Sequence, residues 1–418
     1  MIYMICRAIL VLSFFLAFLH GAAQERKLDY FFQEGLKNSP VIMDLHEQVR
    51  SASIDSLLIK AMNKPQVGFR GYTYYAPVVN HYGYSEILTN IANLTSVMYV
   101  SQPIFNKRTV EASLLKAGIQ HESLSNTIRL AENDLKKAIT ESYLVVYSTF
   151  IEITLDRELI SFAKKEGKIL KSLTEDGICK QTDYFLFMIV LQDQEISLRE
   201  QQILFRRQIS DLNILCGITD TVTITPVKPN LGEIPLVKPG HSPFFERFRI
   251  DSLRIANEKI FINRNYKPAI NWFSDAGLIN NDPMVIYQNF GLSIGLNFTV
   301  PVYDGNQRKL NFQKLKTEED SRSGYAAAFK REYDQRLQQL LKELDQTSAL
   351  LPLDQSQTRN SELLVSQQRE LVSKGAGSIT DYLIAVKNYL SARRNLNQHE
   401  VRILQIRNEI NYWKNSEQ

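Results

Sequence analysis

The clearest pattern in the chain is an alternation of apolar and polar residues over positions 289–300. The apolar positions are Phe290, Leu292, Ile294, Leu296, Phe298 and Val300. The positions between them are small or polar and include Ser293, Gly295, Asn297 and Thr299. Because successive side chains of a strand point to opposite faces, this segment is predicted to be a strand of about eleven residues, the length that a tilted membrane strand needs. The alternation by itself fits a soluble β-sandwich equally well.

Three further segments alternate in the same way, at 269–279, 66–75 and 94–102. The last two are weaker, but they are rich in Tyr and Phe, as the interface girdles of membrane strands are. Polar, turn-rich connections at 76–93 and 280–288 join the strands in pairs. Four strands cannot close a barrel, since about eight is the smallest number that does. An open sheet would leave edges that lipid does not tolerate, so a membrane interpretation requires an oligomer that pools strands.

Helical periodicity dominates the rest of the chain. Over residues 106–174 a seam recurs at steps of three and four, as in a coiled coil, through Leu124, Ile128, Ala131, Leu135, Ala138, Ser142, Val146 and Ile153. A later helical segment of similar length has an equivalent seam, through Tyr333, Leu337, Leu340 and Leu344. A helix of nearly 70 residues would be about 100 Å long at 1.5 Å per residue. Helices over 182–216 and 380–414 complete two hairpins, and shorter helical stretches at 28–62 and 244–264 precede the strand pairs.

The turns of the two hairpins share a short motif. Gly177 and Gly375 are predicted to end the long helices, and Thr182 and Thr380 stand where the next helices begin, each followed by Asp. Thr is a favoured N-cap and Asp a favoured first-turn residue, so turn chemistry alone explains much of the motif. Pro352 lies in the second long helix and has no counterpart in the first one. It is predicted to kink or break the second long helix, at a cost of about 3 kcal/mol.

These shared features indicate a tandem duplication. Gly177 and Gly375 lie the same number of positions apart as Pro103 and Pro301, and the sequence Thr-Asp-Tyr recurs at the same spacing. The period is far too long for a solenoid repeat. We therefore expect a first structural repeat at 24–216, a Pro-rich connector with one short strand at 217–240, and a second repeat at 241–418.

Four prolines mark the predicted borders between strands and helices: Pro65, Pro103, Pro268 and Pro301. Proline lacks an N–H and has a fixed φ that suits the start of a helix, so Pro103 and Pro301 are predicted to end the ladder of strand hydrogen bonds. Ordinary strand punctuation is the alternative interpretation. Their recurrence in both copies favours a built transition from barrel to helices.

The N-terminus and the composition restrict the class of protein. Residues 1–23 have the features of a secretory signal, with Arg7, an apolar run and a small-residue site ending at Ala23. Beyond this segment no apolar run is long enough for a transmembrane helix. The formal charge of +4 is too small to indicate nucleic-acid binding. Two cysteines remain after the signal, Cys179 and Cys216, too few for a disulfide-stapled domain.

The sequence shows little that could support catalysis. Its six histidines are scattered, and none has the spacing of a metal site. Phosphate-binding glycine motifs are also lacking in the sequence, and runs of carboxylates such as 318–320 fit a solvated helix face. We expect no enzyme activity, no cofactor and no metal.

Taken together, the order of elements resembles the TolC-type outer-membrane efflux proteins. The segment 300–305, Val-Pro-Val-Tyr-Asp-Gly, is similar to the junction of that family after its last strand, and 375–383 is similar to its periplasmic tip. The resemblance covers almost all of residues 28–414. The sequence departs from the family at Asn106-Lys107, where Asp-Gly is usual, and at Ile384, where some members have a second acidic residue.

The resemblance implies a fold of mixed α and β class. Three chains would pool four strands each into a twelve-stranded barrel in outer-membrane lipid, continued by a coiled-coil tunnel in the periplasm. It also implies docking on a periplasmic adaptor protein that serves an inner-membrane transporter. Gly177, Gly375 and Gly377 would form the docking tip. Asp381 would be a gate residue, with Asp183 as its counterpart and Thr380 and Thr182 beside them.

We therefore expect a passive exit duct of an efflux or type I secretion system. The duct would be a homotrimeric, porin-like channel without nucleic-acid partners. The rival prediction is a periplasmic coiled-coil scaffold or adhesin with a small soluble sheet and no channel. The strands distinguish the two, because a scaffold would not need an apolar side chain at every second position of 290–300.

Overall fold

The computed structural model describes residues 24–85, 92–104, 107–177, 179–220, 224–232, 242–282 and 284–414. The predicted signal segment 1–23 and Asn106 of the first junction lie outside these ranges. The chain forms two compact units. Unit 1 takes its described residues from Met1–Met43, Arg129–Ser242 and Lys330–Gln418, and unit 2 from Asp44–Ile128 and Pro243–Phe329. Both predicted repeats contribute to both units, and the repeats remain a prediction from the sequence.

The predicted helices are all present in the described part of the chain. Their bounds are α2 Leu28–Asn38, α3 Pro40–Met62, α5 Lys107–Glu175, α6 Gln181–Leu215, α7 Pro243–Asn265, α8 Gln307–Ser373 and α9 Ile379–Lys414. A 3-10 turn, η3, covers Ile286–Gln288. The stretch predicted over 28–62 is divided at Ser39, because Pro40 cannot donate the hydrogen bond that would continue α2 and instead begins α3.

Of the kink or break predicted at Pro352, the break is wrong, because α8 is continuous through this residue. A proline inside a helix leaves the carbonyl four residues earlier without its usual donor. Here that residue is Ser348, and both Ser348 and Pro352 are exposed in the chain. Water can therefore hydrate the freed carbonyl, which removes the main penalty of a buried unpaired group.

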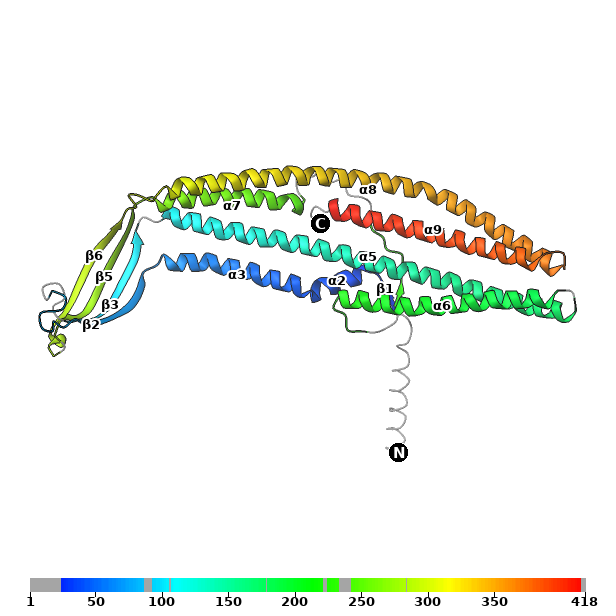
Figure 1. Ribbon diagram of the computed structural model, residues 1–418, viewed down its shortest axis with the longest axis horizontal. Coiled ribbons are helices and arrows are strands. Elements are labelled where there is room, and N and C mark those ends of the chain that lie inside the picture. The colour runs from blue at the N-terminus through cyan, green and yellow to red at the C-terminus, as the bar shows by residue number, and fades with distance from the viewer. Residues whose placement is uncertain are drawn as a thin grey trace, which may run out of the picture. The chain divides into compact units, whose positions relative to one another are not determined.

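Unit 2 contains a four-stranded antiparallel sheet, seen with its strand labels in Figure 1. Its strands are β2 Gln66–Tyr75, β3 Ala92–Ile104, β5 Ala269–Asn280 and β6 Phe290–Thr299, in the order β2-β3-β5-β6. All four strand predictions are confirmed to within a few residues. In β5 and β6, Trp272 pairs with Leu296 and Ala276 with Leu292, which places the predicted apolar residues of both strands on one face.

The prediction that Pro103 ends its ladder is wrong. Pro103 lies inside β3 and pairs with Asn271 of β5. The pairing of β2 with β3 stops at Gln66 and Ser101, so β3 has no β2 partner at Pro103. A proline is tolerated in a strand where its missing N–H faces an unpaired side. Pro301 behaves as predicted, since β6 ends at Thr299.

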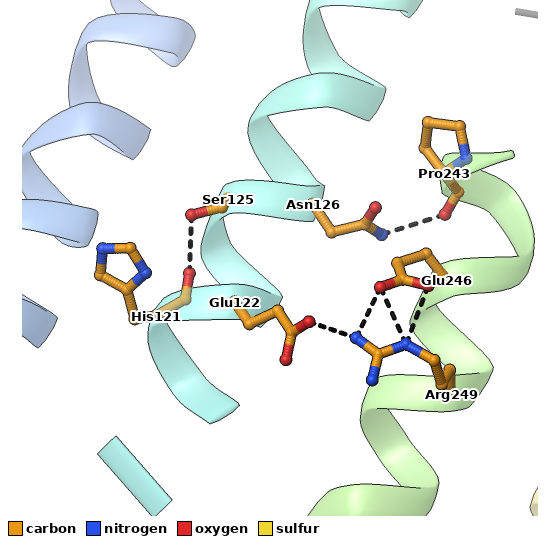
Figure 2. Close-up of polar contacts among 7 residues, drawn as sticks. All are labelled: His121, Glu122, Ser125, Asn126, Pro243, Glu246 and Arg249. Carbon is orange, nitrogen blue, oxygen red and sulfur yellow. Dashed lines mark hydrogen bonds and ion pairs between the residues drawn. The ribbon is translucent and has the colours of Figure 1, made fainter. Parts of the chain in front are cut away.

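Polar contacts join α5 and α7 within unit 2 (Figure 2). The Arg249 guanidinium lies between the carboxylates of Glu246 on its own helix and Glu122 on α5. The buried Asn126 side chain donates to the carbonyl of Pro243 at 3.0 Å, at the start of α7. A second buried amide, Asn257, donates to the carbonyl of Ala112 at 3.1 Å. These bonds fix how α7 lies along the first part of α5.

Unit 1 has its largest core around Tyr143 of α5, a side chain with no solvent exposure. Its hydroxyl accepts the N–H of Val227 at 2.9 Å and lies 3.1 Å from the Arg26 carbonyl. Both lie at a two-stranded parallel sheet of β1 Gln24–Arg26 and β4 Ile224–Pro226. Arg26 is the last residue of β1, and Val227 directly follows β4. The connector was predicted to hold one short strand, which is β4, whereas β1 was not predicted.

The long predicted seams are partly confirmed by burial. Ile128, Val146 and Ile153 of α5 are buried, as are Tyr333 and Leu340 of α8. None of the helices in the described ranges combines the length and the hydrophobicity of a membrane-crossing helix.

Candidate functional site

The sheet of unit 2 exposes one apolar face. On β6 the side chains of Leu292, Ile294 and Leu296 are 78%, 80% and 70% exposed. Val67 and Phe69 of the opposite edge strand β2 are also exposed on this face. A single soluble chain rarely leaves so large a contiguous apolar surface uncovered. The face is therefore a contact surface for lipid or for protein.

The other face of the sheet is small and polar with aromatic inserts. Gly295 faces the Phe273 ring, which would lie 2.5 Å from a Cβ added at this position. A larger residue at this position would require the ring to shift. On the same face the Ser293 hydroxyl donates to the Asp275 carboxylate at 2.7 Å. The predicted division into an apolar and a small, polar face thus agrees with the strand register.

The two edges of the sheet are β2 and β6. All neighbouring strands are antiparallel, so the two edge strands run in opposite directions. An exposed edge strand carries a row of backbone groups that can pair with another chain. Opposite edge directions mean that β6 of one copy can meet β2 of the next in antiparallel pairing.

All four junctions with the helices lie at one end of the sheet (Figure 1). The structure places Pro65, Pro268 and Pro301 between a helix and a strand, while Pro103 is the penultimate residue of β3. In the junction after β6, the Asp304 carboxylate accepts backbone N–H groups of Asn306 at 3.0 Å and Arg308 at 2.7 Å. The hydrogen bond from the Tyr266 hydroxyl is the largest cause that lowers the pKa of Asp304, and these two backbone bonds lower it further. Asp304 therefore caps α8.

The turns of the two helical hairpins lie together in unit 1. Gly375 has φ +69° and Gly177 has φ +73°, the left-handed conformation that favours glycine. At the second turn the N–H of Gly375 bonds to Val372 and that of Ala376 to Leu371, which forms a Schellman motif. A Cβ added at Gly377 would lie 2.9 Å from the backbone nitrogen of Val372. The end of α8 therefore already occupies the space beside Gly377.

The N-cap role predicted for Thr182 and Thr380 is wrong. Helix α6 begins at Gln181 with Lys180 as its N-cap, and α9 begins at Ile379, so each Thr is the second residue of its helix. Both turns need fewer residues than predicted before the next helix starts. Asp183 and Asp381 are consequently third residues, in the first turn, where a carboxylate is stabilised by the helix dipole.

An apolar cluster holds the two hairpins together near these turns. Its buried members include Leu170 of α5, Phe187 of α6 and Ile379 and Tyr382 of α9. Burial raises the pKa of Tyr382. Asp381 next to it is exposed. The cluster thus fixes the backbone that carries Asp381 while the carboxylate itself reaches the surface.

Sequence reasoning missed a buried polar cluster further along the hairpins. The Asp156 side chain of α5 is 1% exposed and lies 3.3 Å from the Arg394 guanidinium of α9. The Gln201 amide of α6 donates to the same carboxylate at 3.0 Å. Burial is the largest influence on nearby Glu152 and raises its pKa. Asp156 continues the three-and-four spacing from Ile153, and a carboxylate in an apolar seam was the signal that could have revealed it.

Within the described ranges, no group of three or more His, Cys, Asp or Glu side chains could hold a metal ion. Cys179 and Cys216 are both free. Burial raises the pKa of the Cys216 thiol to about 12.

No family model matches the sequence, and comparison with curated proteins also gives no match. Solved structures do match. The outer membrane protein VceC from Vibrio cholerae has a TM-score of 0.73 at 13% identity, over 92% of this chain and 95% of VceC. The outer-membrane channel OprN has a TM-score of 0.77 at 14% identity, over 93% and 90%. CusC, described as undergoing transmembrane channel formation, has a TM-score of 0.79 at 11% identity, over 94% and 93%. The chain therefore has the fold of these outer-membrane channel proteins, as its resemblance to the TolC-type proteins predicted.

Proposed function

We propose that this protein is an outer-membrane exit duct, a passive conduit whose helical part lies in the periplasm. The observation that carries the proposal is the uncovered apolar face of an open sheet, on a chain with the fold of outer-membrane channels. Lipid would cover that face through Leu292, Ile294 and Leu296. The opposite face, with Ser293 and Asp275, would line water, as the interior of a transmembrane barrel does.

A trimer provides the closure that the isolated sheet lacks. Lipid does not tolerate unpaired backbone groups, so the edges β2 and β6 require partners. Pairing β6 of each chain with β2 of the next would join three four-stranded sheets into one barrel of twelve strands. The opposite directions of the two edges support this arrangement, because every new pair would be antiparallel like the pairs within the chain.

The hairpin turns would face the periplasm and dock on an adaptor protein of an inner-membrane transporter, which would select and drive the substrate. Gly177 suits this role, because nothing lies within 4 Å of an added Cβ there. A partner helix could therefore approach its backbone. Gly377 is less suited, since α8 packs against it. The carboxylate of Asp381 would stand at the channel mouth as the gate residue.

Membrane fractionation of the mature chain tests the duct directly. We expect the protein in the outer-membrane fraction, resistant to carbonate extraction, and released by mild detergent as a trimer in light scattering. Reconstitution in planar bilayers should give discrete conductance steps. Recovery in the soluble periplasm, or a stable folded monomer in detergent, would contradict the duct and favour the scaffold or adhesin.

A further inference from the structure

Basic side chains collect at the end of the sheet where the chain joins its helices. Each of the four junctions contributes two of them. They are Lys60 and Lys64 before β2, Lys107 and Arg108 after β3, Arg264 and Lys267 before β5, and Arg308 and Lys309 after β6. We call these eight residues the basic collar. Only two acidic residues, Glu111 and Asp304, lie in the same segments (60–65, 105–111, 264–268 and 300–309), and Asp304 is already engaged in capping α8.

The connections at the opposite end of the sheet have the reverse charge. In sequence, segments 76–91 and 281–288 contain no Lys or Arg, and they contain the acidic residues Glu86 and Asp282. In sequence, therefore, the junctions with the helices are strongly basic and the other two connections are weakly acidic. Both ends carry comparable numbers of Tyr and Asn, so the difference lies in charge and not in general polarity.

Ion pairing within the chain does not account for the collar. Among the described residues, none of the eight cations lies within 4.0 Å of a carboxylate, and all but Arg264 are exposed. The Arg308 guanidinium donates to the neutral Asn263 amide oxygen at 2.8 Å. The same guanidinium lies 5.5 Å from the centroid of the Tyr266 ring, a cation–π contact. Both contacts orient the side chain, and neither supplies a negative charge.

Helix electrostatics accounts for half of the collar at most. Lys60 and Arg264 lie in the last turns of α3 and α7, where a cation is favourable. Lys107, Arg108, Arg308 and Lys309 lie at the starts of α5 and α8, where the helix dipole disfavours a cation. Neither helix has an acidic residue in its first turn, unlike α6 and α9. These four cations are therefore placed against the intrinsic preference of their helices.

We propose that the basic collar binds the phosphodiester headgroups of anionic phospholipids in the membrane leaflet on the helix side. The inference rests on the proposed duct, and it adds a lipid partner and an insertion depth. Collar cations would meet headgroups at the depth where the apolar face of the sheet ends, beside Phe298 and Trp272. Each Lys or Arg near an anionic surface contributes attraction that falls off within a Debye length. In a phospholipid the phosphate lies directly beside the acyl chains. Exposed cations directly beside an apolar surface match this arrangement, because the cations would contact the phosphate and the apolar surface would contact the acyl chains.

The test compares two full-length variants with equal changes of charge. The first replaces the four cations at helix starts (K107Q, R108Q, R308Q and K309Q). The control replaces four exposed cations of unit 1 for which the described part of the chain shows no ion pair (R157Q, K165Q, K168Q and R359Q). Trimers are placed in nanodiscs of mixed phosphatidylglycerol and phosphatidylcholine, and the lipid that remains bound after detergent exchange is quantified. We expect wild type and control to retain phosphatidylglycerol in preference to phosphatidylcholine. In the collar variant the ratio of retained phosphatidylglycerol to phosphatidylcholine should be about tenfold lower.

Further arms separate the possible sources of phosphate and the possible failures. Soluble glycerophosphoglycerol and inorganic phosphate should not compete at millimolar concentration, because they lack the acyl chains that the apolar face requires. High salt should weaken the lipid selectivity of the wild type, and this arm serves if the collar variant does not fold. The proposed lipid binding by the basic collar is wrong if the collar variant keeps the selectivity of the wild type. It is also wrong if the wild type inserts but shows no selectivity. Failure of every form to insert, including into phosphatidylcholine alone, instead overturns the duct.

Discussion

The Arg394 guanidinium on α9 lies 3.3 Å from the Asp156 carboxylate on α5, and the two sides of this pair are buried unequally. The Asp156 side chain is 1% exposed, whereas that of Arg394 is 35% exposed. A buried charge that loses its partner costs more than one that can reach water. The ion pair therefore couples the two hairpins, and its two members should differ in what their loss costs.

Arg394→Met should destabilise the protein more than Asp156→Asn. The first change leaves a buried carboxylate with only the Gln201 bond, at a cost of about 3 kcal/mol. The second leaves an arginine that water can still hydrate. Chemical denaturation of both variants and of the double variant measures the effects, and the double variant should recover part of the loss. Equal costs for the two single variants would show that the difference in burial has no energetic weight.

Glu152→Gln should stabilise the protein at pH 8 and have little effect at pH 4. Burial raises the pKa of Glu152 above 4.5, with Asp156 adding to the shift and Arg394 opposing it. The native state therefore binds this proton more tightly than the unfolded state, so stability declines as pH rises from about 4.5 through the higher native pKa.

Thermal melting at the two pH values measures this effect, because glutamine removes the charge that burial disfavours. Glu332→Gln is the matched control, since Glu332 is exposed on α8 and its replacement should change the melting temperature little. A Glu152→Gln variant that loses stability equally at pH 4 and pH 8 would contradict the assignment.

Gly375→Ala should cost about 1 kcal/mol of stability, because alanine disfavours the left-handed conformation with φ +69°. Gly177→Ala should behave alike at φ +73°. Gly118→Ala is the control, because Gly118 lies inside α5 with nothing within 4 Å of an added Cβ. Alanine there should stabilise by about 0.5–1 kcal/mol. Denaturation midpoints test the contrast, and a loss at Gly118 as large as that at Gly375 would refute it.

Ile294→Arg should impair assembly in the membrane far more than Ser293→Arg. The two residues are neighbours on β6 but face opposite sides of the sheet. Under the proposed function, a charge at the lipid midplane costs about 2–4 kcal/mol, whereas the lumen accepts one. The yield of heat-modifiable trimer in outer-membrane extracts provides the measurement. Equal yields would mean that the alternation does not divide lipid from lumen.

Local patterns were enough to predict the strands and helices, because their period fixes which residues share a face. Because apolar and polar residues alternate over 290–299, strand geometry places Leu292 and Leu296 on the same face of the sheet. Positions determined by distant contacts could not be predicted in this way. Strand β1 has only three residues and no pattern of its own, and it is held by β4 and by Tyr143.

The candidate site shows the same limit. The glycines of the turns were predicted correctly, because a left-handed residue is a local requirement. The starts of α6 and α9 were each predicted one residue too late, since the closing bonds of the preceding turn decide them. The position of Asp156 in an apolar seam could have indicated a buried carboxylate, but its partner Arg394 lies 238 positions away. Local periodicity does not identify so distant a partner.

Under the proposed function, Asp381→Ala should weaken the cation preference and the divalent-ion block of the channel, while Asp183→Ala should change neither. Both carboxylates are third residues of their helices and gain the same helix-dipole stabilisation. Loss of that local role should therefore lower the thermal midpoint similarly in both variants. Only a residue that converges with its copies near the axis of the trimer would also alter permeation, because like charges in a narrow mouth attract cations and respond to divalent ions. Reversal potentials and magnesium titrations in planar bilayers separate the two roles. If Asp381→Ala keeps wild-type selectivity while losing the same stability as Asp183→Ala, its carboxylate serves only the start of α9, and the gate lies elsewhere along the tunnel.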